Sequence, residues 1–448
     1  MRRSRTTVLG ALAATLTLTL SACSGAGDGR ERLELWFWGA PPEHQKALET
    51  ALVEGFERAQ DTYSLDINFN NAVDKNIQVA LSADRGPDVV YGSGPAFAAA
   101  YVAEDKLADM TPYAEQYGWK DRLLEPMYES GTIGGKLYSL PNSVDTLGVF
   151  YNKKVLDRLG VAVPESYADL TTAMDKAKAE GLYASVTGNK GWKPVNLNYI
   201  SIFLTHLAGG KATYDALHGE AKWTDPEIVE AVEASAEFYR DGYLAGDDYA
   251  NLNFVESMQL LADEKSPFFI GPSLGFQFAS EYFNDEAGNT GDLGFMPFPN
   301  VNPDLPSPMY TLGATASLSI NAASDHKDGA AAVIDYMMSA PFAKEINKTW
   351  PGYWGVPLKD FDLPAAEYTG LSKEYIGTVG KLVSAINEGH YGLYPGTFFP
   401  PSTSTTLADV DGVWLGQVGA AEFLTKVQAS FDADKAKGLV PPAPEPSN

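Results

Sequence analysis

A short segment around Ser273 has the residue types and spacing of a catalytic nucleophile. The run from Gly271 to Gly275 matches the G-x-S-x-G elbow of serine hydrolases and follows a short apolar stretch. A serine hydrolase also needs an aspartate and a histidine to complete its catalytic triad. Candidates follow later in the chain: Asp292 or Asp325 for the aspartate, and His326 or His390 for the histidine. Acidic residues number 58, so such an order arises easily, and the only oxyanion-hole candidate, His206 to Gly210, lacks contiguous glycines. An exported hydrolase, of serine or glycoside type, therefore stays an alternative.

The histidines and the cysteine do not form a metal-binding pattern. The five histidines are scattered without an i, i+4 pair, and Cys23 is the only cysteine. The acidic turn from Asp285 to Asp292 departs from the EF-hand spacing and is expected to be a solvated loop. No G-x-x-x-x-G-K-[ST] motif occurs, so the chain is not expected to hydrolyse ATP. We predict no metal and no cofactor.

The first residues have the layout of an export signal. A basic start with Arg2 and Arg3 precedes an apolar run from Val8 to Leu20, and small residues then lead to Cys23. The order Leu20-Ser21-Ala22-Cys23 resembles the lipobox of bacterial lipoproteins, whose cysteine is diacylated. We predict a signal peptide over 1–22, lipidation of Cys23 and a lipid-anchored tether over 23–30. A plain secretory signal, with Cys23 left as a thiol, is the alternative.

Composition narrows the class of protein further. The 448 residues carry 33 basic and 58 acidic side chains, a formal charge of −25. Loss of 1–22 would remove three arginines and leave the mature chain near −28. This charge argues against nucleic-acid binding, and one cysteine excludes an intrachain disulfide. No later run of 18 apolar residues occurs, so membrane contact is expected through the lipid anchor only.

The candidate functional residues must be positioned by helices and strands, which the hydrophobic periodicity of the sequence predicts. The first part of the mature chain alternates between periods of 2 and 3.6 residues. This alternation predicts parallel strands joined by crossover helices, with ligands bound beyond the carboxyl ends of the strands. The predicted segments are strands at 33–37, 65–69 and 88–91, helices at 43–59 and 74–83, and ligand loops at 38–42 and 92–95.

The rest of the chain continues as a mixture of helices and strands. Ser166 and Thr224 introduce helix-start signals. The Pro-rich tail over 437–448 is expected to be frayed. The other predicted segments are a hairpin at 133–137, strands at 147–151, 267–270 and 294–299, and a helix at 328–338.

Four segments in this order carry a family resemblance: 86–90 (GPDVV), 107–113 (LADMTPY), 135–141 (GKLYSLP) and 149–153 (VFYNK). Behind a lipobox, they resemble the extracellular solute-binding proteins of ABC importers, in the carbohydrate-binding branch related to maltose-binding protein. Segments 294–299 and 324–331 also resemble that group. The resemblance covers nearly the whole mature chain.

The resemblance implies an α/β fold of two lobes, each a mostly parallel sheet flanked by helices, with a hinge between them. One lobe would comprise 31–142 plus 300–343, and the other 143–299 plus 344–436. Such a protein would act as a monomer on the extracytoplasmic face of the cell membrane. It would capture a carbohydrate and deliver it to ABC permease subunits, without being an enzyme. A non-sugar solute such as a polyamine is the alternative ligand.

Sugars present apolar C–H faces and many hydroxyls, so their sites need flat aromatic side chains and directional polar groups. Several tryptophans fall at loop positions rather than at helical core spacing, and polar residues stand near the strand ends that the resemblance marks as site loops. The ligand-binding residues predicted on this basis are Trp38, Glu43, Ser93, Asn142, Asp145, Trp192, Asn196, Gly271, Ser273, Phe276, Gly313 and Trp354.

Overall fold

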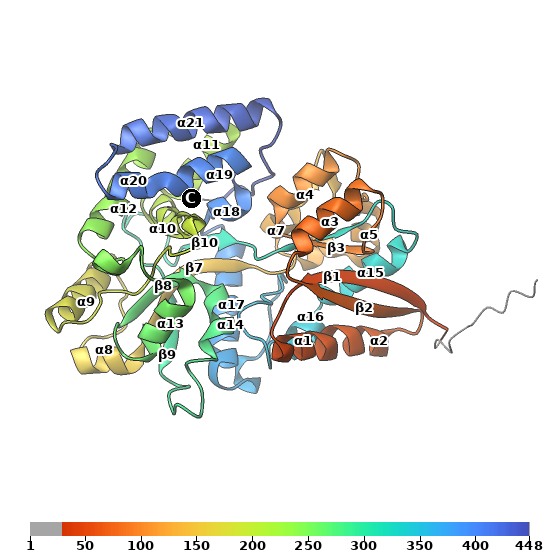
Figure 1. Ribbon diagram of the computed structural model, residues 1–448, viewed down its shortest axis with the longest axis horizontal. Helices are drawn as coiled ribbons and strands as arrows, with labels where there is room; N and C mark the ends of the chain where they lie inside the picture. Colours follow the sequence, from red (N-terminus) through yellow and green to blue (C-terminus); the bar gives the residue numbers. More distant parts are fainter. Residues whose placement is uncertain (1–28, 448) are drawn as a thin grey trace, which may run out of the picture.

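The computed structural model describes residues 29–447 and arranges them as two α/β lobes that lie side by side (Figure 1). The predicted signal peptide, Cys23 and the tether up to residue 28 lie outside the described residues. Each lobe is built on one five-stranded sheet, and a two-stranded hairpin, β4 (Thr132–Ile133) with β5 (Lys136–Leu137), completes the strands. The two-lobed α/β fold expected from the resemblance is confirmed.

The first sheet has the strand order β2-β1-β3-β11-β6. Its strands are β1 (Glu31–Trp38), β2 (Tyr63–Asn70), β3 (Val89–Gly92), β6 (Leu140–Pro141) and β11 (Ser317–Ile320). β1 runs parallel to β2 and to β3, as the strand–helix alternation predicts. Alternate residues of β1 face opposite sides, so Phe37 packs into the main core of the lobe while Trp36 and Trp38 pack toward a smaller cluster.

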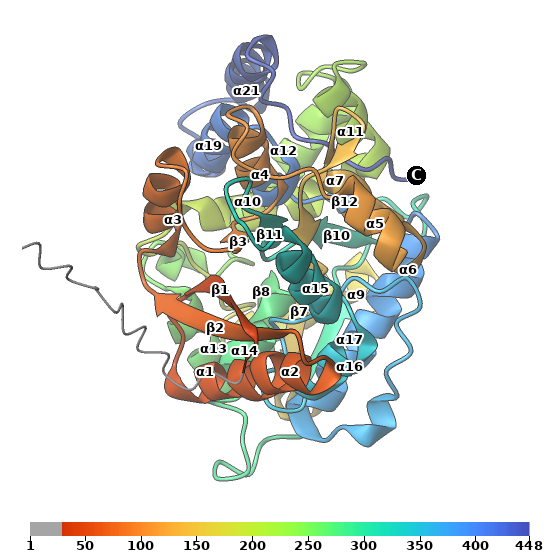
Figure 2. The ribbon, with the colours of Figure 1, turned by 90° about the vertical axis from the view of Figure 1, so that its right-hand side faces the viewer.

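Helices cover both faces of this sheet. The helix predicted from residue 43 is α1 (Pro42–Leu48), a π-helical turn (Glu49–Glu54) and α2 (Gly55–Ala59), and its apolar stripe buries Leu48, Leu52 and Phe56. Figure 2 shows α1 and α2 running beside β1 and β2, with α3 (Val73–Ser82) on the far side. The remaining helices are α4 (Pro95–Val102), α5 (Thr111–Tyr117), α6 (Trp119–Arg122), α7 (Glu125–Ser130), α15 (Lys327–Met337) and α16 (Ala340–Ile346).

The second sheet is centred on β7. Its strands are β7 (Asp145–Asn152), β8 (Phe268–Pro272), β9 (Leu293–Pro297), β10 (Tyr310–Gly313) and β12 (Tyr391–Leu393). Only β10 and β12 pair in parallel, whereas β7 is antiparallel to β8, β9 and β10. The expectation of mostly parallel sheets is therefore wrong for this lobe. The reason is that β7 enters the lobe and β10 leaves it, so the two neighbours run in opposite directions.

The second lobe holds most of the helices. The capping box predicted at Ser166 is present at the start of α9, with reciprocal bonds between Ser166 and Asp169. The helices are α8 (Lys153–Leu159), α9 (Tyr167–Ala179), α10 (Asn196–Phe203), α11 (Gly210–His218), α12 (Pro226–Arg240), α13 (Phe254–Ala262), α14 (Phe276–Ala279), α17 (Gly370–Asn387), α18 (Pro395–Phe398), α19 (Pro401–Leu407), α20 (Asp411–Trp414) and α21 (Ala420–Ala436).

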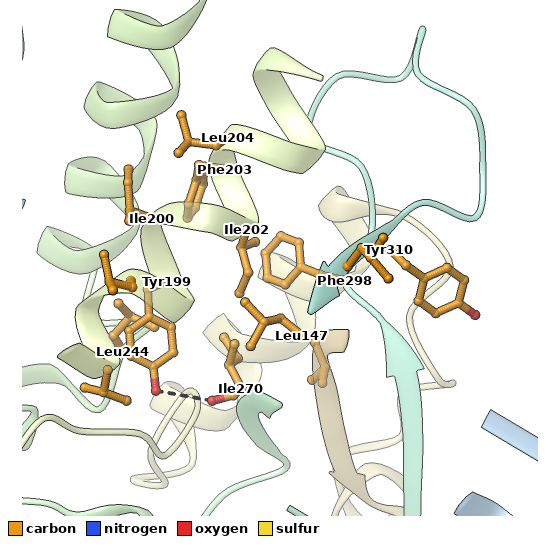
Figure 3. Packing of buried hydrophobic residues seen from close by; sticks show 14 of the residues in the cluster. Leu147, Tyr199, Ile200, Ile202, Phe203, Leu204, Leu244, Ile270, Phe298 and Tyr310 are labelled. Atoms are coloured by element: carbon orange, nitrogen blue, oxygen red, sulfur yellow. Dashed lines mark hydrogen bonds between the residues drawn. The ribbon is translucent and has the colours of Figure 1, made fainter. Parts of the chain in front are cut away.

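Each lobe has its own hydrophobic core. In the second lobe, Leu147 of β7 and Ile270 of β8 pack against α10, where the hydroxyl of Tyr199 donates to the carbonyl of Ile270 at 3.3 Å (Figure 3). Full burial of each such aliphatic side chain contributes about 1.5–3 kcal/mol. The first core extends from Leu33 to Leu358 and includes Trp354. Two separate cores allow the lobes to move as units about the segments that join them.

Two strands pass between the lobes in opposite directions. The chain leaves β6 and enters β7 through 142–144, and it returns from β10 to β11 through 314–316. The two passages pair with each other at both ends, Leu140 opposite Leu318 and Asp145 opposite Gly313. A third passage near Gly355 lies against them, since its carbonyl accepts from the N–H of Val144 at 2.6 Å. These passages form the hinge region.

The C-terminal tail is not frayed as its composition suggests. The N–H of Ser447 donates to the carbonyl of Gly389, and Tyr391 donates through its hydroxyl to the carbonyl of Glu445. Val440 and Ala443 pack against the core of the second lobe. Pro441, Pro444 and Pro446 are buried in this strap, so the prolines, which donate no backbone hydrogen bond, contribute apolar contacts instead. Among residues 29–447, no helix has the length and apolar character that crossing a membrane requires.

Candidate functional site

A cavity of about 1230 Å³ lies between the two lobes, beside the hinge region. The first lobe contributes Trp38 at the end of β1, Ser93 after β3, Phe97 of α4 and Tyr353. The passages contribute Asp145 and 313–315, and the second lobe contributes the rest of the wall. The loops after β1 and β3 thus reach the cavity, as the position of ligand sites in parallel sheets predicts.

Asp145 is one of the two aspartates that line the cavity, the other being Asp409. Its Oδ1 accepts hydrogen bonds from the hydroxyl of Ser273 and from the N–H of Leu274, the latter at 3.1 Å. Burial raises the pKa of Asp145 to about 6, although these bonds and one from the N–H of Thr146 act in the opposite direction. The carboxylate is fixed by protein donors on one side and lines the cavity, so it can accept hydrogen bonds from a ligand.

Aromatic side chains form much of the cavity wall. They are Trp38, Phe97, Trp192, Phe254, Phe278, Tyr353, Tyr394 and Phe399. Trp38 is held by a hydrogen bond from its Nε1 to Asp74 at 3.2 Å and by an edge-to-face contact with Tyr91. Burial raises the pKa of Tyr353 and of Tyr394, so both hydroxyls stay protonated at neutral pH. These rings offer flat apolar surfaces of the kind that stack on the C–H faces of a ligand.

Polar groups stand between the rings. They are Ser93, Asp145, Thr146, Lys190, Lys193, Asn198, Asn253, Gln277, Thr311, Thr315, Thr397, Ser404, Thr405 and Asp409. The hydroxyl of Thr315 is buried without a hydrogen-bond partner among the described residues. A buried hydroxyl in this state favours a ligand or water that completes its bonding.

Five of the twelve residues predicted from the sequence line this cavity: Trp38, Ser93, Asp145, Trp192 and Gly313. Gly313 faces the ring of Tyr394, and a Cβ there would lie 3.4 Å from its Cδ1. That these five residues contact a ligand is still a prediction.

Four other predicted residues lie next to the cavity without lining it. Gly271, Ser273, Phe276 and Trp354 are buried, whereas their sequence neighbours Pro272, Leu274, Gln277 and Tyr353 line the wall. Trp354 packs instead against Phe37 and Phe342 in the first core. The loops predicted from the sequence reach the cavity, but which side chain of each loop lines the wall depends on the tertiary packing.

The last three predicted residues have other surroundings. Asn142 is buried in the hinge region, and Asn196 is buried with bonds to Asn189, Tyr249 and the carbonyl of Ala408. Glu43 is exposed in the first turn of α1 and does not line the cavity. Acidic residues in a first turn are favourable without any ligand, because they complement the helix dipole.

The surroundings of Ser273 differ from those of a hydrolase nucleophile. Its hydroxyl donates to Asp145 and accepts from the N–H of Thr146 at 3.3 Å, and the side chain is buried. Within residues 29–447, no histidine is hydrogen-bonded to Ser273; His326 pairs with Glu31 and His390 with Glu388. The geometry of a serine–histidine pair is therefore not present in the described part of the chain.

Several cavity residues escaped the sequence analysis. They are Phe254 and a C-terminal stretch with Tyr394, Phe399 and parts of 401–409, and these two parts of the wall lie far apart in the chain. One available signal was the Tyr394-Pro395-Gly396 sequence, since proline and glycine together mark a break between elements, here between β12 and α18. No group of three His, Asp or Glu side chains able to hold a metal ion occurs among residues 29–447.

A family model described as bacterial extracellular solute-binding protein matches residues 40–344. Among curated proteins, a probable sugar-binding periplasmic protein of Mesorhizobium japonicum is 27% identical over 115 residues, which are 25% of this chain and 27% of that protein. The matched part thus spans about a quarter of the relative's length.

Solved structures share the fold over almost the whole chain. A chitin oligosaccharide binding protein superposes with a TM-score of 0.73 at 19% identity, covering 92% of this chain and 100% of that one. The GacH receptor of Streptomyces glaucescens, solved unliganded and with acarbose, has a TM-score of 0.65 at 21% identity, with 92% and 98% covered. At such identities the likeness establishes the two-lobed architecture.

Proposed function

Because the chain belongs to the bacterial extracellular solute-binding proteins, we propose that it captures a sugar between its lobes and delivers it to an ABC permease. The observation that carries this proposal is the cavity between the lobes, with eight aromatic side chains and many neutral hydrogen-bonding groups. Rings stack on the C–H faces of a sugar, while hydroxyls, amides and Asp145 bond its hydroxyl groups. The sugar-binding names of the relatives support the same ligand class.

The cavity favours a sugar over the other ligands and reactions considered. A polyamine site needs several carboxylates to match its ammonium groups, whereas this wall has two aspartates and two lysines, and Asp409 is already paired with Lys193. The bonding of Ser273 gives no support to a serine hydrolase. The proposed activity therefore makes and breaks no covalent bond.

Function would depend on closure of the lobes about the hinge region. A ligand that contacts both walls at once binds the closed state more tightly than the open one, and this difference shifts the equilibrium toward closure. The two cores suggest a division slightly different from the one expected from the sequence, with Leu124 and Met127 of the first lobe packing into the second core. In the proposed division, 29–142 with 316–358 moves against 144–312 with 368–447.

Lipidation of Cys23 would hold the protein on the extracytoplasmic face of the membrane as a monomer. Replacement Cys23→Ala should release the protein into the medium, because two acyl chains are needed for stable anchoring. Fractionation of cells followed by immunoblotting measures this release. Membrane association that is unchanged in the variant would refute the anchor.

Ligand binding is tested by tryptophan fluorescence and thermal shift of the full-length protein in mild detergent against a panel of sugars. A ligand at a thousandfold excess over Kd adds about 4 kcal/mol to the free energy of unfolding, so a true ligand raises Tm clearly. A saturable response, with the sugar recovered intact, supports the proposal. No response to any sugar, or recovery of cleaved sugar, would overturn it.

A further inference from the structure

Trp192 is an exposed aromatic side chain at the edge of the cavity. It lines the wall and is 58% exposed, the largest side chain among the exposed apolar residues of the described chain. Within residues 29–447, no ring contact accompanies it, in contrast to Trp38, Trp350, Trp354 and Trp414. Val255, also exposed, lines the same cavity, and exposed apolar side chains that gather at one cavity are typical of a binding surface.

The loop that carries Trp192 is held firmly. On the backbone, the N–H groups of Asn189 and Lys190 donate to the carbonyls of Tyr249 and Leu252, both at 3.0 Å. Gly188 packs so tightly on the same two carbonyls that a Cβ would approach them within 2.5 Å. A positive φ of 78° at Gly191 then turns the chain toward Trp192. The tryptophan is therefore presented by a loop that has little freedom.

Two lysines flank Trp192, and each is paired with protein carboxylates. Lys190 contacts Glu256 at 2.7 Å, and Lys193 contacts Asp409 at 2.7 Å and Asp411 at 3.2 Å. The hydrogen bond with Asp409 is the largest cause of the raised pKa of Lys193. Lys190 thereby connects the loop to the first turn of α13, and Lys193 connects it to α20 and to the 3₁₀ turn that precedes α20. The positive charge of both lysines is thus already matched inside the protein.

The charge of the wall is consequently unsuited to an anion. Lys190 and Lys193 are the cations of the wall, and Asp145 has no cationic partner among the described residues. An acidic sugar would place its carboxylate near Asp145 without an unmatched cation to balance it. Sugar hydroxyls, in contrast, can donate to this carboxylate.

The size of the cavity adds an independent argument. Its volume of about 1230 Å³ exceeds the range of roughly 300–1,000 Å³ typical of small-molecule sites. Aromatic side chains stand at both lobes, with Trp38 on the first and Trp192 on the second. A single sugar ring would leave much of this wall uncovered.

We infer that the cavity takes a neutral oligosaccharide, that an outer sugar unit stacks on Trp192, and that Lys190 and Lys193 position this loop rather than bind ligand charge. This inference rests on the proposed sugar-binding function and specifies its substrate class.

The test is calorimetric titration of the full-length protein in mild detergent. The probes are malto-, cello-, xylo- and chito-oligosaccharides of one to five units, with oligogalacturonides as the acidic series. We expect affinity in the binding series to rise at least about tenfold from one unit to three, and oligogalacturonides to bind at least about tenfold more weakly. Trp192→Ala should weaken trisaccharide binding about tenfold and change monosaccharide binding less than about twofold.

Matched variants separate the possible results. Leu415→Ala removes another exposed apolar side chain of the second lobe, outside the cavity, and should leave all affinities unchanged. Lys193→Met should weaken binding of the longer neutral sugars and leave binding of the acidic series weak.

Equal affinity for one sugar unit and for three, or no effect of Trp192→Ala on trisaccharide binding, overturns this inference while the proposed sugar-binding function stands. Tighter binding of oligogalacturonides, lost in Lys193→Met, overturns it too. Absence of any sugar binding overturns the proposed function itself.

Discussion

Asn142 and Ala316 are joined by reciprocal hydrogen bonds where two chain passages cross between the lobes. The N–H of Asn142 donates to the carbonyl of Ala316 at 3.0 Å, and the N–H of Ala316 donates to Oδ1 of Asn142 at 2.9 Å. The amide of the same side chain donates to the hydroxyl of Tyr91 at 3.2 Å. Asn142, predicted as a ligand contact, thus stabilises the hinge region in this structure.

Replacement Asn142→Ala should lower the free energy of unfolding by about 2–3 kcal/mol, because it leaves the buried N–H of Ala316 without its acceptor and removes one of the two partners of the Tyr91 hydroxyl, the other being Tyr353. Urea denaturation followed by circular dichroism measures this change. Asn251→Ala, at an exposed asparagine of the second lobe, is the control and should stay within about 0.5 kcal/mol of the wild type. Equal stability of the two variants would contradict the role of Asn142 in the hinge.

Asp145 should make sugar binding sensitive to mildly acidic pH. Its pKa is raised to about 6, so the carboxylate becomes protonated as pH falls through 6 and loses charge-assisted hydrogen bonds to sugar hydroxyls. We expect Kd to rise below pH 6 in the wild type. Asp145→Asn should weaken binding about tenfold at pH 7.5 and remove this pH dependence.

Titration calorimetry between pH 4.5 and 8 checks these expectations for Asp145. Asp263→Asn, an exposed aspartate after α13, is the matched control and should retain the wild-type profile. Wild-type binding that is independent of pH across this range would show that the charge of Asp145 does not contribute.

Ser273 should matter for stability and not for covalent chemistry. Ser273→Ala removes the acceptor of the Thr146 N–H and a donor to Asp145, at a cost of about 1–2 kcal/mol in the free energy of unfolding. A serine-reactive fluorophosphonate should leave the wild-type protein unlabelled, as judged by intact mass. Labelling that disappears in Ser273→Ala would instead revive the hydrolase alternative.

His206 should weaken the fold at acidic pH. The side chain is fully buried, and burial lowers its pKa from 6.5 to about 4 despite a hydrogen bond to Asn300. Between these values the unfolded chain binds more protons than the folded protein, so the free energy of unfolding falls as pH decreases from 6.5 to 4. Between pH 7 and 5 the loss due to His206 is about 2 kcal/mol.

Urea denaturation at pH 7 and pH 5 tests the effect of His206. The difference in unfolding free energy between the two pH values should shrink by about 2 kcal/mol in His206→Gln. His218→Gln, at an exposed histidine, should keep the wild-type difference. Asp145 acts in the opposite sense, since its raised pKa makes the folded state bind more protons, but this contribution is present in the wild type and in His206→Gln and cancels in their comparison. An unchanged difference in His206→Gln would contradict the prediction.

Local patterns in the sequence were sufficient for several secondary-structure elements of both lobes. The alternation at 33–37 became β1, the helical stripe from residue 43 became α1 and α2, and the capping residues at Ser166 started α9. Periodicity and capping act within a few residues, so they can be read from one segment alone. Trp38, Ser93 and Asp145 could be located in the same way, because each stands at the end of a strand.

The choice between ligand wall, hinge and core was decided by the tertiary structure. Asn142 joined the hinge region, Trp354 joined the first core, and Tyr394 and Phe399 reached the cavity from a distant part of the chain. Side chains a single residue apart, such as Ser273 and Leu274, differ in whether they line the cavity. The sequence by itself determined many of the elements and several of the loops that reach the cavity. Which side chains meet there was determined by packing between segments hundreds of residues apart, a contact that no local pattern encodes.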